Sequence, residues 1–341
     1  MCDCIGAGSG FQDWWNRTSH AIITHGYTLQ VREPPLKTPA RLGLILALGV
    51  LAMSSATIFI RLAQAEGVPS LVIAAYRMAV ATVAISIPAL SQQAWKSYRG
   101  LGWRETGTLV AAGALLGLHF AVWITSLAYT SVVSSVVLVT TTPLWAGLAS
   151  PLLLGERTPR LLWGGMALAI AGGAIVGIAD GAAGQTTLLG NLLALSGAFL
   201  MAGYLIIGRR VRARLPLVPY LWIVYATATV LLTGWSLTAG LSLTGFPPAA
   251  WLWLVALGLI PQLIGHTAAN YAVRYVSATF VGVSILGEPI GSTVLAMVIL
   301  DEQPTPLQLL GGALILTGIV LSSLAEERKR ARRNTAVELA D

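Results

Sequence analysis

The chain has 341 residues, of which 55% are hydrophobic and 10% are charged, with a formal net charge of +7. Because a typical soluble domain has about 25% charged residues, this chain lacks the charge to cover a water-soluble surface. The apolar residues form long blocks with short basic clusters between them, which indicates a polytopic membrane protein and argues against nucleic acid as a partner.

The chain opens with a tail and continues with ten apolar segments. Residues 1–40 contain no continuous apolar stretch, so we expect a disordered cytoplasmic tail and not a signal peptide. A membrane helix needs about 20 apolar residues. The expected spans are 41–65, 69–90, 107–128, 132–154, 161–179, 188–208, 219–240, 250–273, 277–300 and 307–324. Residues 325–341 form a basic tail.

The distribution of Lys and Arg predicts the orientation of these spans, because short basic loops face the cytoplasm. With the N-terminus inside, every basic residue except Arg61 and Arg77 falls in a cytoplasmic segment. We therefore expect both chain termini in the cytoplasm.

The second half of the chain repeats the first. An offset of 146 aligns residues 130–156 with residues 276–302. The repeated unit holds five spans, an odd number, so the second copy must be inverted in the membrane. Inverted repeats are typical of secondary transporters, since two equivalent halves can exchange roles when access alternates. The aligned pairs are Tyr129 with Tyr275, Ser131 with Ser277, Pro143 with Pro289 and Glu156 with Glu302.

One series of features occurs in TPLWAGLASPLLLGERTPRLLWGGMALAIAGG (142–173) and again in EPIGSTVLAMVILDEQPTPLQLLGGALILTG (288–318). It is a proline-bearing helix, a terminal Glu, a short loop and a Gly-Gly-rich helix. Both segments resemble the ten-helix EamA-type members of the drug/metabolite transporter (DMT) superfamily, and AAYRMAVATV (74–83) resembles the second helix of that family. The resemblance implies an all-α membrane fold with ten transmembrane helices around a central cavity. Its two inverted five-helix repeats would be 41–180 and 187–324, in the bacterial inner membrane.

The resemblance also implies a function, since members of this type mostly export amino acids, metabolites or drugs without ATP. We expect a secondary transporter that exports amino acids or related small metabolites. A multidrug or cationic-compound exporter is the alternative within this class. A membrane-embedded enzyme with Glu288 and His266 as acid and base, or a non-transporting scaffold, are the alternatives outside it. We expect no enzymatic activity, cofactor or metal; the expected partners are a small-molecule substrate, membrane lipid and, as a candidate coupling ion, protons.

Pro143 and Pro289 lie within the predicted spans at equivalent positions of the two repeats. A proline inside a helix removes one backbone hydrogen bond and clashes with the carbonyl four residues earlier. In lipid, the freed carbonyl needs a partner or a water-lined cavity. The two prolines therefore predict a bent pair that flanks and gates the pathway, with simple packing kinks as the alternative.

Glu288 is a carboxylate inside the otherwise uncharged run 276–300. A charge at that depth costs at least about 2.5–3.5 kcal/mol on insertion scales. Glu288 therefore either serves the pathway, by binding a cationic group or a proton, or forms a structural pair with Arg77, the other charge inside a span. The equivalent residue of the first repeat is Thr142, so we expect no symmetric pair of carboxylates.

Polar and aromatic residues gather on two further helix faces. His119 and Trp123 are four residues apart and share one face, and His266 and Asn270 share another, with Tyr271 beside them. Polar groups that face lipid are costly, so both faces should point inward. For each residue alone, interhelical hydrogen bonding is the alternative. Together with Glu288, Arg77 and Thr142 they predict the lining of the cavity.

The remaining candidates have weaker patterns. Tyr76 is a deep aromatic residue that could contact a substrate or simply pack. Glu156 and Glu302 each precede the N-terminus of another helix, where the dipole favours an anion, so we expect structural caps. Paired glycines inside the spans predict close helix packing; they are Gly164-Gly165, Gly172-Gly173 and Gly311-Gly312.

Overall fold

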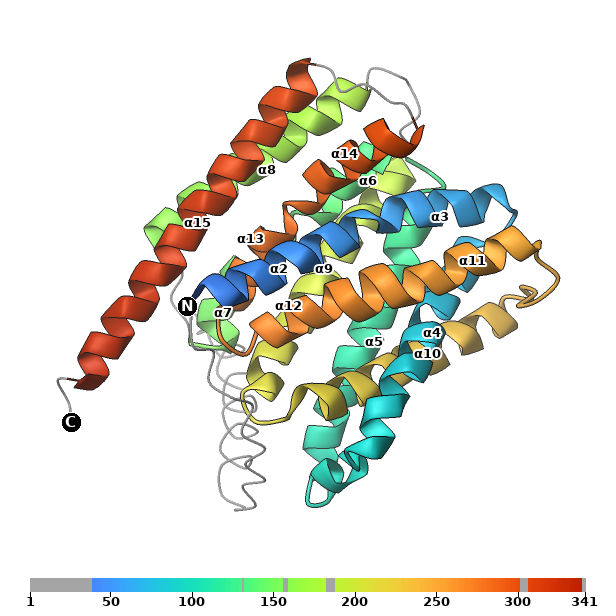
Figure 1. Ribbon diagram of the computed structural model, residues 1–341, viewed down its shortest axis with the longest axis horizontal. Helices are drawn as coiled ribbons and strands as arrows, with labels where there is room; N and C mark the ends of the chain where they lie inside the picture. The colour runs from blue at the N-terminus through green and yellow to red at the C-terminus, as the bar shows by residue number, and fades with distance from the viewer. Residues whose placement is uncertain (1–38, 131, 156–158, 182–187, 301–305, 339–341) are drawn as a thin grey trace, which may run out of the picture.

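The computed structural model describes residues 39–130, 132–155, 159–181, 188–300 and 306–338, and the regular structure in these ranges is helical throughout (Figure 1). The helices are α2 (Pro39–Ser54), α3 (Ala56–Ala65), α4 (Ser70–Ser91), η1 (Ala94–Tyr98), α5 (Trp103–Ser126), α6 (Val132–Val139), α7 (Thr142–Leu153), α8 (Arg160–Gly181), α9 (Leu188–Arg212), α10 (Leu217–Thr238), α11 (Pro248–Leu257), η2 (Gly258–His266), α12 (Thr267–Ala272), α13 (Ala278–Ile285), α14 (Glu288–Leu300) and α15 (Pro306–Glu338).

Within the described ranges, seven helical segments are long and apolar enough to cross a bilayer, judged by length and composition. They are Ala40–Ala65, Ser70–Ser91, Trp103–Ser126, Leu188–Arg212, Leu217–Thr238, Pro248–Ala272 and Phe280–Ile299. Two shorter apolar helices cover Arg160–Ile175 and Leu309–Ser322. The chain is therefore a multi-pass membrane protein, and the number of ten spans stays a prediction.

Several expected spans consist of two helices joined at a break. α2 gives way to α3 at Ser55, α6 to α7 at 140–141, and α13 to α14 at 286–287. At the first and third of these breaks, the Ser54 hydroxyl donates to the Glu288 carbonyl oxygen (3.2 Å) and the Ser292 hydroxyl donates to the Ser54 carbonyl oxygen (2.9 Å). Backbone groups exposed by a break inside lipid need such partners. The reciprocal bonds fix α14 against the junction of α2 and α3.

The centre of the molecule is a bundle in which α5 packs against α9 and α10, and α10 packs against α4. α5 approaches α10 closely at Gly113, where an added Cβ would lie 2.7 Å from the Val224 carbonyl oxygen. The buried faces of these helices include Leu116, Phe120 and Ile124, each fully buried. This bundle holds α5 and α4 rigidly, and both helices contribute side chains to the site described below.

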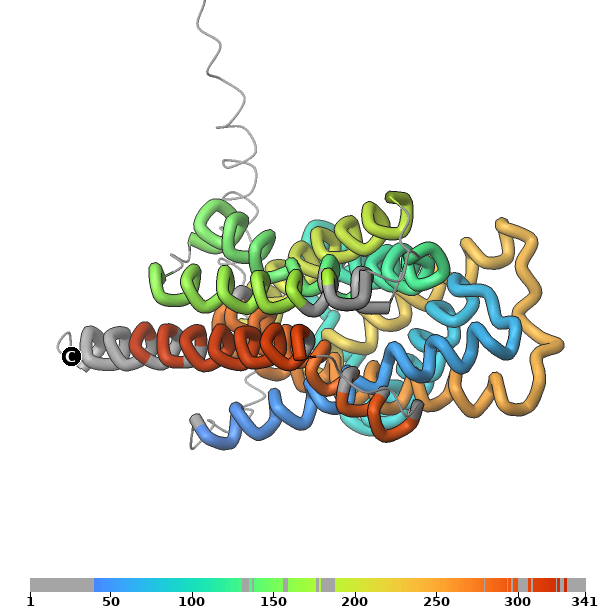
Figure 2. The backbone as a smooth tube through the Cα atoms, turned by 90° about the horizontal axis from the view of Figure 1, so that it is seen from above, coloured from blue at the N-terminus to red at the C-terminus, as the bar shows by residue number. Residues whose placement is uncertain are grey.

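Helices α8 and α15 form a second layer along one flank, and they run side by side in both views of the chain (Figures 1 and 2). Their axes approach at Gly165, Gly172 and Gly318, where an added Cβ would meet backbone atoms of the opposite helix closer than 3 Å. Close packing is thus confirmed for Gly165 and Gly172. The prediction of close packing is wrong for Gly164 and Gly312, because an added Cβ at either residue would meet no neighbouring atom within 4 Å.

Candidate functional site

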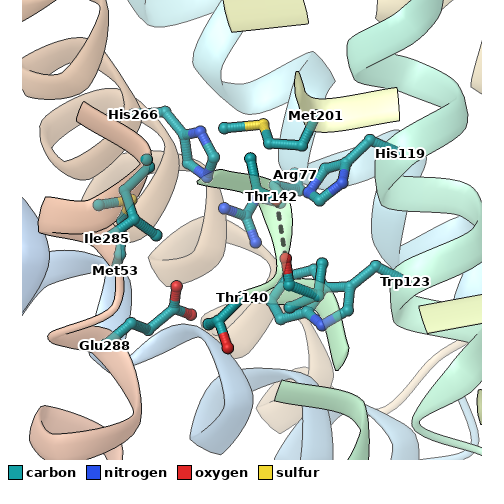
Figure 3. Close-up of a pocket in the computed structure, with 12 residues that line it drawn as sticks. Met53, Arg77, His119, Trp123, Thr140, Thr142, Met201, His266, Ile285 and Glu288 are labelled. Atoms are coloured by element: carbon teal, nitrogen blue, oxygen red, sulfur yellow. Dashed lines mark hydrogen bonds between the residues drawn. The ribbon is translucent and has the colours of Figure 1, made fainter. Parts of the chain in front are cut away.

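One small cavity lies among the helices, and Figure 3 shows the side chains around it. It is lined by Met53, Arg77, His119, Trp123, Val139, Thr140, Thr142, Met201, His266, Gly282, Ile285 and Glu288. The space measures about 30 Å³, which is room for roughly two water molecules. Six of the residues predicted from the sequence therefore meet at one place: Arg77, His119, Trp123, Thr142, His266 and Glu288.

Arg77 projects from α4 into this cavity and is only 1% exposed. Its Nε donates to the Gln262 side-chain oxygen (2.9 Å), and its guanidinium lies 4.1 Å from the centre of the Phe120 ring. A cation over an aromatic face is attracted by the ring quadrupole. Nη1 of Arg77 has no hydrogen-bond partner within the described residues. The guanidinium is therefore held in position on one side and left with an unused donor.

Glu288 begins α14 and reaches the same cavity from the opposite repeat, with 8% of its surface exposed. Figure 3 shows its carboxylate and the Arg77 guanidinium directed at the same central space. The hydrogen bond recorded for Glu288 in the described part of the chain is to its backbone, whose carbonyl oxygen accepts from Ser54. A direct structural pair with Arg77 is thus not formed in this conformation, although both charges face one cavity.

The two histidines of the cavity each pack against an aromatic side chain. His119 Nδ1 contacts the Gly197 carbonyl oxygen at 2.9 Å, and since a carbonyl only accepts, Nδ1 carries the proton. The His119 ring stacks on Trp123, with 5.9 Å between centroids. His266 packs edge-on against Phe120 at 5.2 Å. Neither Trp123 Nε1 nor His266 Nδ1 has a hydrogen-bond partner among the described residues.

His266 belongs to an unusual helix segment. Residues Gly258–His266 (η2) are π-helical, with Pro261 inside the segment. Single π-turns in α-helices occur frequently at functional sites, and a proline, which lacks an N–H, favours such an irregular turn. The segment also carries Gln262, which is fully buried and accepts the hydrogen bond from Arg77. The local geometry of η2 therefore positions both a cavity histidine and the partner of the cavity arginine.

The two predicted prolines lie just after helix breaks. Pro143 is in the first turn of α7 and Pro289 is the second residue of α14, positions at which a missing N–H costs little. The Thr142 hydroxyl donates to the Val139 carbonyl oxygen (2.7 Å), the group that Pro143 leaves without its helical partner. An added Cβ on Gly282 of α13 would lie 3.3 Å from Pro143. The break in α6–α7 thus packs directly on α13; a gating role for it stays a prediction.

Three predicted cavity residues lie elsewhere. The Asn270 side chain accepts from the Tyr204 hydroxyl (2.6 Å) and donates to the His266 carbonyl oxygen (2.7 Å). Tyr271 packs on Tyr275, with 5.1 Å between ring centroids. The Tyr76 hydroxyl donates to the Leu243 carbonyl oxygen (2.7 Å). None of the three lines the cavity in this conformation. The two predicted caps, Glu156 and Glu302, lie outside the described residues.

Six lining residues were not predicted: Met53, Val139, Thr140, Met201, Gly282 and Ile285. The repeat offset could have found four of them. Met53 and Met201 lie 148 positions apart, and Val139 and Ile285 lie 146 positions apart. His119 and His266 lie 147 positions apart, and Thr142 and Glu288 lie 146 positions apart, so all four spacings fall within two positions of the repeat offset. Related positions of the two halves therefore contribute matching walls to the cavity.

Most of the helical region matches one protein family. The profile of the EamA-like transporter family matches residues 41–178 and, a second time, residues 188–324. This chain belongs to the EamA-like transporter family. The cavity of this EamA-family protein receives residues from both matched segments, with Arg77 in the first and Glu288 in the second.

Individual curated proteins match shorter parts of the chain. Over 89 residues it is 37% identical to a protein of Streptantibioticus cattleyicolor named "Probable terminal-alkyne amino-acid exporter", covering 26% of this chain and 30% of that protein. Over 73 residues it is 30% identical to an "Uncharacterized transporter" of Archaeoglobus fulgidus, covering 21% of this chain and 27% of that protein. The matched segments thus span less than a third of these curated relatives.

The fold has a counterpart among solved structures. One crystal structure superposes with a TM-score of 0.71 over 85% of this chain and 99% of the other, at 21% identity. At that identity the likeness shows the fold alone. Within the described residues, no group of three or more His, Cys, Asp or Glu is placed to hold a metal ion.

Proposed function

We propose that this EamA-family protein is a secondary transporter, independent of ATP, that exports amino acids or related small metabolites by alternating access. The observation that carries the proposal is the central cavity, to which both family-matched segments contribute and in which a buried guanidinium and a buried carboxylate face one space. Buried charges in a membrane-spanning region mark substrate or ion pathways. The S. cattleyicolor relative named as an amino-acid exporter supports the substrate class.

The size of the cavity supports alternating access. A space of about 30 Å³ is far below the roughly 300–1,000 Å³ of small-molecule sites. A metabolite therefore enters only after the surrounding helices move apart. The helix breaks at 140–141 and 286–287 supply places where such movement costs few backbone hydrogen bonds. We infer that the described conformation is closed around the pathway.

The proposal includes an architecture. We infer ten spans in two inverted five-helix repeats, with both termini in the cytoplasm of a bacterium and the protein in its inner membrane. The family profile matching twice and the paired positions of the cavity walls support two repeats, and the basic residues support the orientation. The two halves do not carry the same charges, because Glu288 of the second half corresponds to the uncharged Thr142 of the first. The two halves thus share a shape but differ in charge, which suits a substrate held in one orientation.

Tracer efflux from liposomes tests the function. The purified protein is reconstituted and the liposomes are loaded with a labelled amino acid, a purine or a cationic drug. We expect protein-dependent efflux of amino acids without chemical change. Efflux of the cationic drug alone would favour a cationic-compound exporter, and release of a chemically altered product would favour a membrane enzyme. Absence of any flux or product would refute transport.

Protons are the candidate coupling ion, and Glu288 is the group to carry them. Its carboxylate faces the cavity without a recorded hydrogen-bond partner among the described residues, so protonation breaks no structural bond. Among the described residues that line the cavity, Glu288 is the one acid. A carboxyl group that exchanges a proton in step with substrate binding is the simplest means of coupling there. Liposomes with and without an imposed pH gradient separate coupled export from facilitated diffusion.

A further inference from the structure

We propose that the cavity contains a carboxylate-binding site formed by Arg77 Nη1 together with the ring nitrogens Trp123 Nε1 and His266 Nδ1. A free carboxylate group is then the feature by which the protein recognises its substrate. This inference rests on the proposed function and specifies it, because it names the group that the site binds.

The first argument is the set of unused hydrogen-bonding groups. Arg77 Nη1, Trp123 Nε1 and His266 Nδ1 are buried, have no partner within the described part of the chain, and belong to side chains that line one cavity. The first two are donors only, and Nδ1 of a histidine donates in the tautomer that holds its proton there. Buried polar groups are normally satisfied, so a cluster of unsatisfied donors indicates a ligand that accepts.

The second argument is the fixed orientation of the guanidinium. Its Nε is bonded to Gln262 at 2.9 Å, and its flat face rests on Phe120 at 4.1 Å. These two contacts use one edge and one face of the group, and Nη1 keeps no partner among the described residues. Figure 3 shows the guanidinium directed at the central space. A guanidinium fork matches the two oxygens of a carboxylate in geometry and charge. The site is therefore organised before the ligand arrives.

The third argument selects a carboxylate over other anions. Glu288 faces the same cavity, so an anionic ligand meets its negative charge as well as the positive charge of Arg77. Inorganic phosphate carries no cationic group, so its repulsion from Glu288 offsets its attraction to Arg77. A ligand that carries a cationic amine beside its carboxylate gains from both charges, with the amine toward Glu288. The surrounding Met53, Met201 and Ile285 supply apolar walls for the rest of the molecule.

A series of probes that differ in one group tests this site. The purified full-length protein in detergent is heated with each of the twenty L-amino acids and with 4-methylpentanoate and benzoate, and the shift in Tm is measured. Each amino acid that stabilises is compared with its amide and its decarboxylated amine. We expect the free acids to stabilise and the amides and amines to lose the effect. Equal stabilisation by acid and amide, or none by any carboxylate, would overturn the proposal.

Matched variants assign the effect to the named donors. Arg77→Gln should weaken the apparent affinity for the stabilising acid about 10- to 100-fold, the range expected for a charged hydrogen bond. Arg77→Lys should retain part of it, and Trp123→Phe should lose a smaller factor while keeping the ring. Arg61→Gln, at an exposed arginine of α3, should change nothing. An unchanged affinity in Arg77→Gln and Trp123→Phe would overturn the assignment, and if Arg77→Gln does not fold, Arg77→Lys and Trp123→Phe decide.

The outcomes separate this inference from the proposed function. If carboxylates stabilise the protein through Arg77 but no amino acid leaves loaded liposomes, export of amino acids fails and the binding site stands. If amino acids are exported and their amides compete equally well, the function stands and the carboxylate site fails.

Discussion

The contact between α8 and α15 gives the sharpest prediction about the fold. Gly164 and Gly165 are neighbours in α8, yet only Gly165 lies in the contact with α15. An added Cβ at Gly165 would lie 2.6 Å from the Gly318 carbonyl oxygen and 3.0 Å from the Ser322 backbone nitrogen, whereas an added Cβ at Gly164 meets nothing within 4 Å. The substitutions Gly165→Ala and Gly164→Ala therefore add the same methyl group in opposite environments.

The magnitude follows from these distances. An ordinary contact needs about 3.4 Å, so at Gly165 the backbones must separate by roughly 0.8 Å from the 2.6 Å approach. A gap of that size forfeits about a quarter to a half of the dispersion attraction along the contact, and overpacking typically costs about 1–3 kcal/mol. Alanine gains up to about 1 kcal/mol of helix propensity at both positions, so this gain cancels between the two variants. They should thus differ in free energy of unfolding by about 1–3 kcal/mol.

Thermal unfolding in detergent, followed by the loss of the main peak in size-exclusion chromatography, measures the difference. We expect Gly164→Ala to match or exceed the wild type and Gly165→Ala to lose several degrees of Tm. Equal Tm values for the two variants would refute the packing of α8 on α15 at this position. They would also refute the close contact at Gly165, Gly172 and Gly318 that joins the two family-matched segments.

Three further predictions concern the site and its surroundings. Glu288→Gln should abolish efflux driven by a pH gradient and leave substrate exchange intact; unchanged gradient-driven efflux in liposomes would exclude proton carriage at this residue. Asn270→Leu should lower stability by about 1–3 kcal/mol, because it leaves the Tyr204 hydroxyl buried without its partner. The affinity of this variant for the stabilising acid should stay unchanged. A large loss of affinity would show that Asn270 does contribute to the binding site. Burial raises the pKa of Tyr98, in η1 outside the spans, above its ordinary value of 10. Since the unfolded chain ionises first, stability should fall as the pH rises above 10. In thermal melts above pH 10, Tyr98→Phe should lose less stability with rising pH than the wild type. An identical pH dependence of Tm in both proteins would show that Tyr98 does not cause the loss.

The charged and imidazole residues of the cavity could be predicted because each is costly in lipid. Arg77, Glu288, His119 and His266 stand out in apolar runs, and a polar group at that depth must find a partner or a cavity. The structure brings all four together. The apolar and small lining residues carry no such signal, since a methionine in a membrane helix costs nothing wherever it points.

Asn270 shows where helical spacing misleads. It follows His266 by four residues, and a regular α-helix would place both side chains on one face. The amide instead bonds back to the His266 carbonyl and across to Tyr204. Asn270 lies in α12, the α-helix that follows the π-helical segment Gly258–His266, so an irregular spacing is not the cause. The spacing could not show that the Asn270 amide is already used by Tyr204 and by the His266 carbonyl.

Side-specific labelling of a cavity residue tests most directly whether the central cavity is the substrate pathway. The cysteines of the chain are Cys2 and Cys4, so replacing both with serine gives a background for Met201→Cys in the cavity wall. Phe199→Cys, on the exposed face of the same helix, is the control. A membrane-impermeant thiol reagent should label Met201→Cys from either side of the membrane and more slowly when a transported substrate is present. No labelling of Met201→Cys from either side, or labelling that substrate never slows, would contradict a pathway through this cavity.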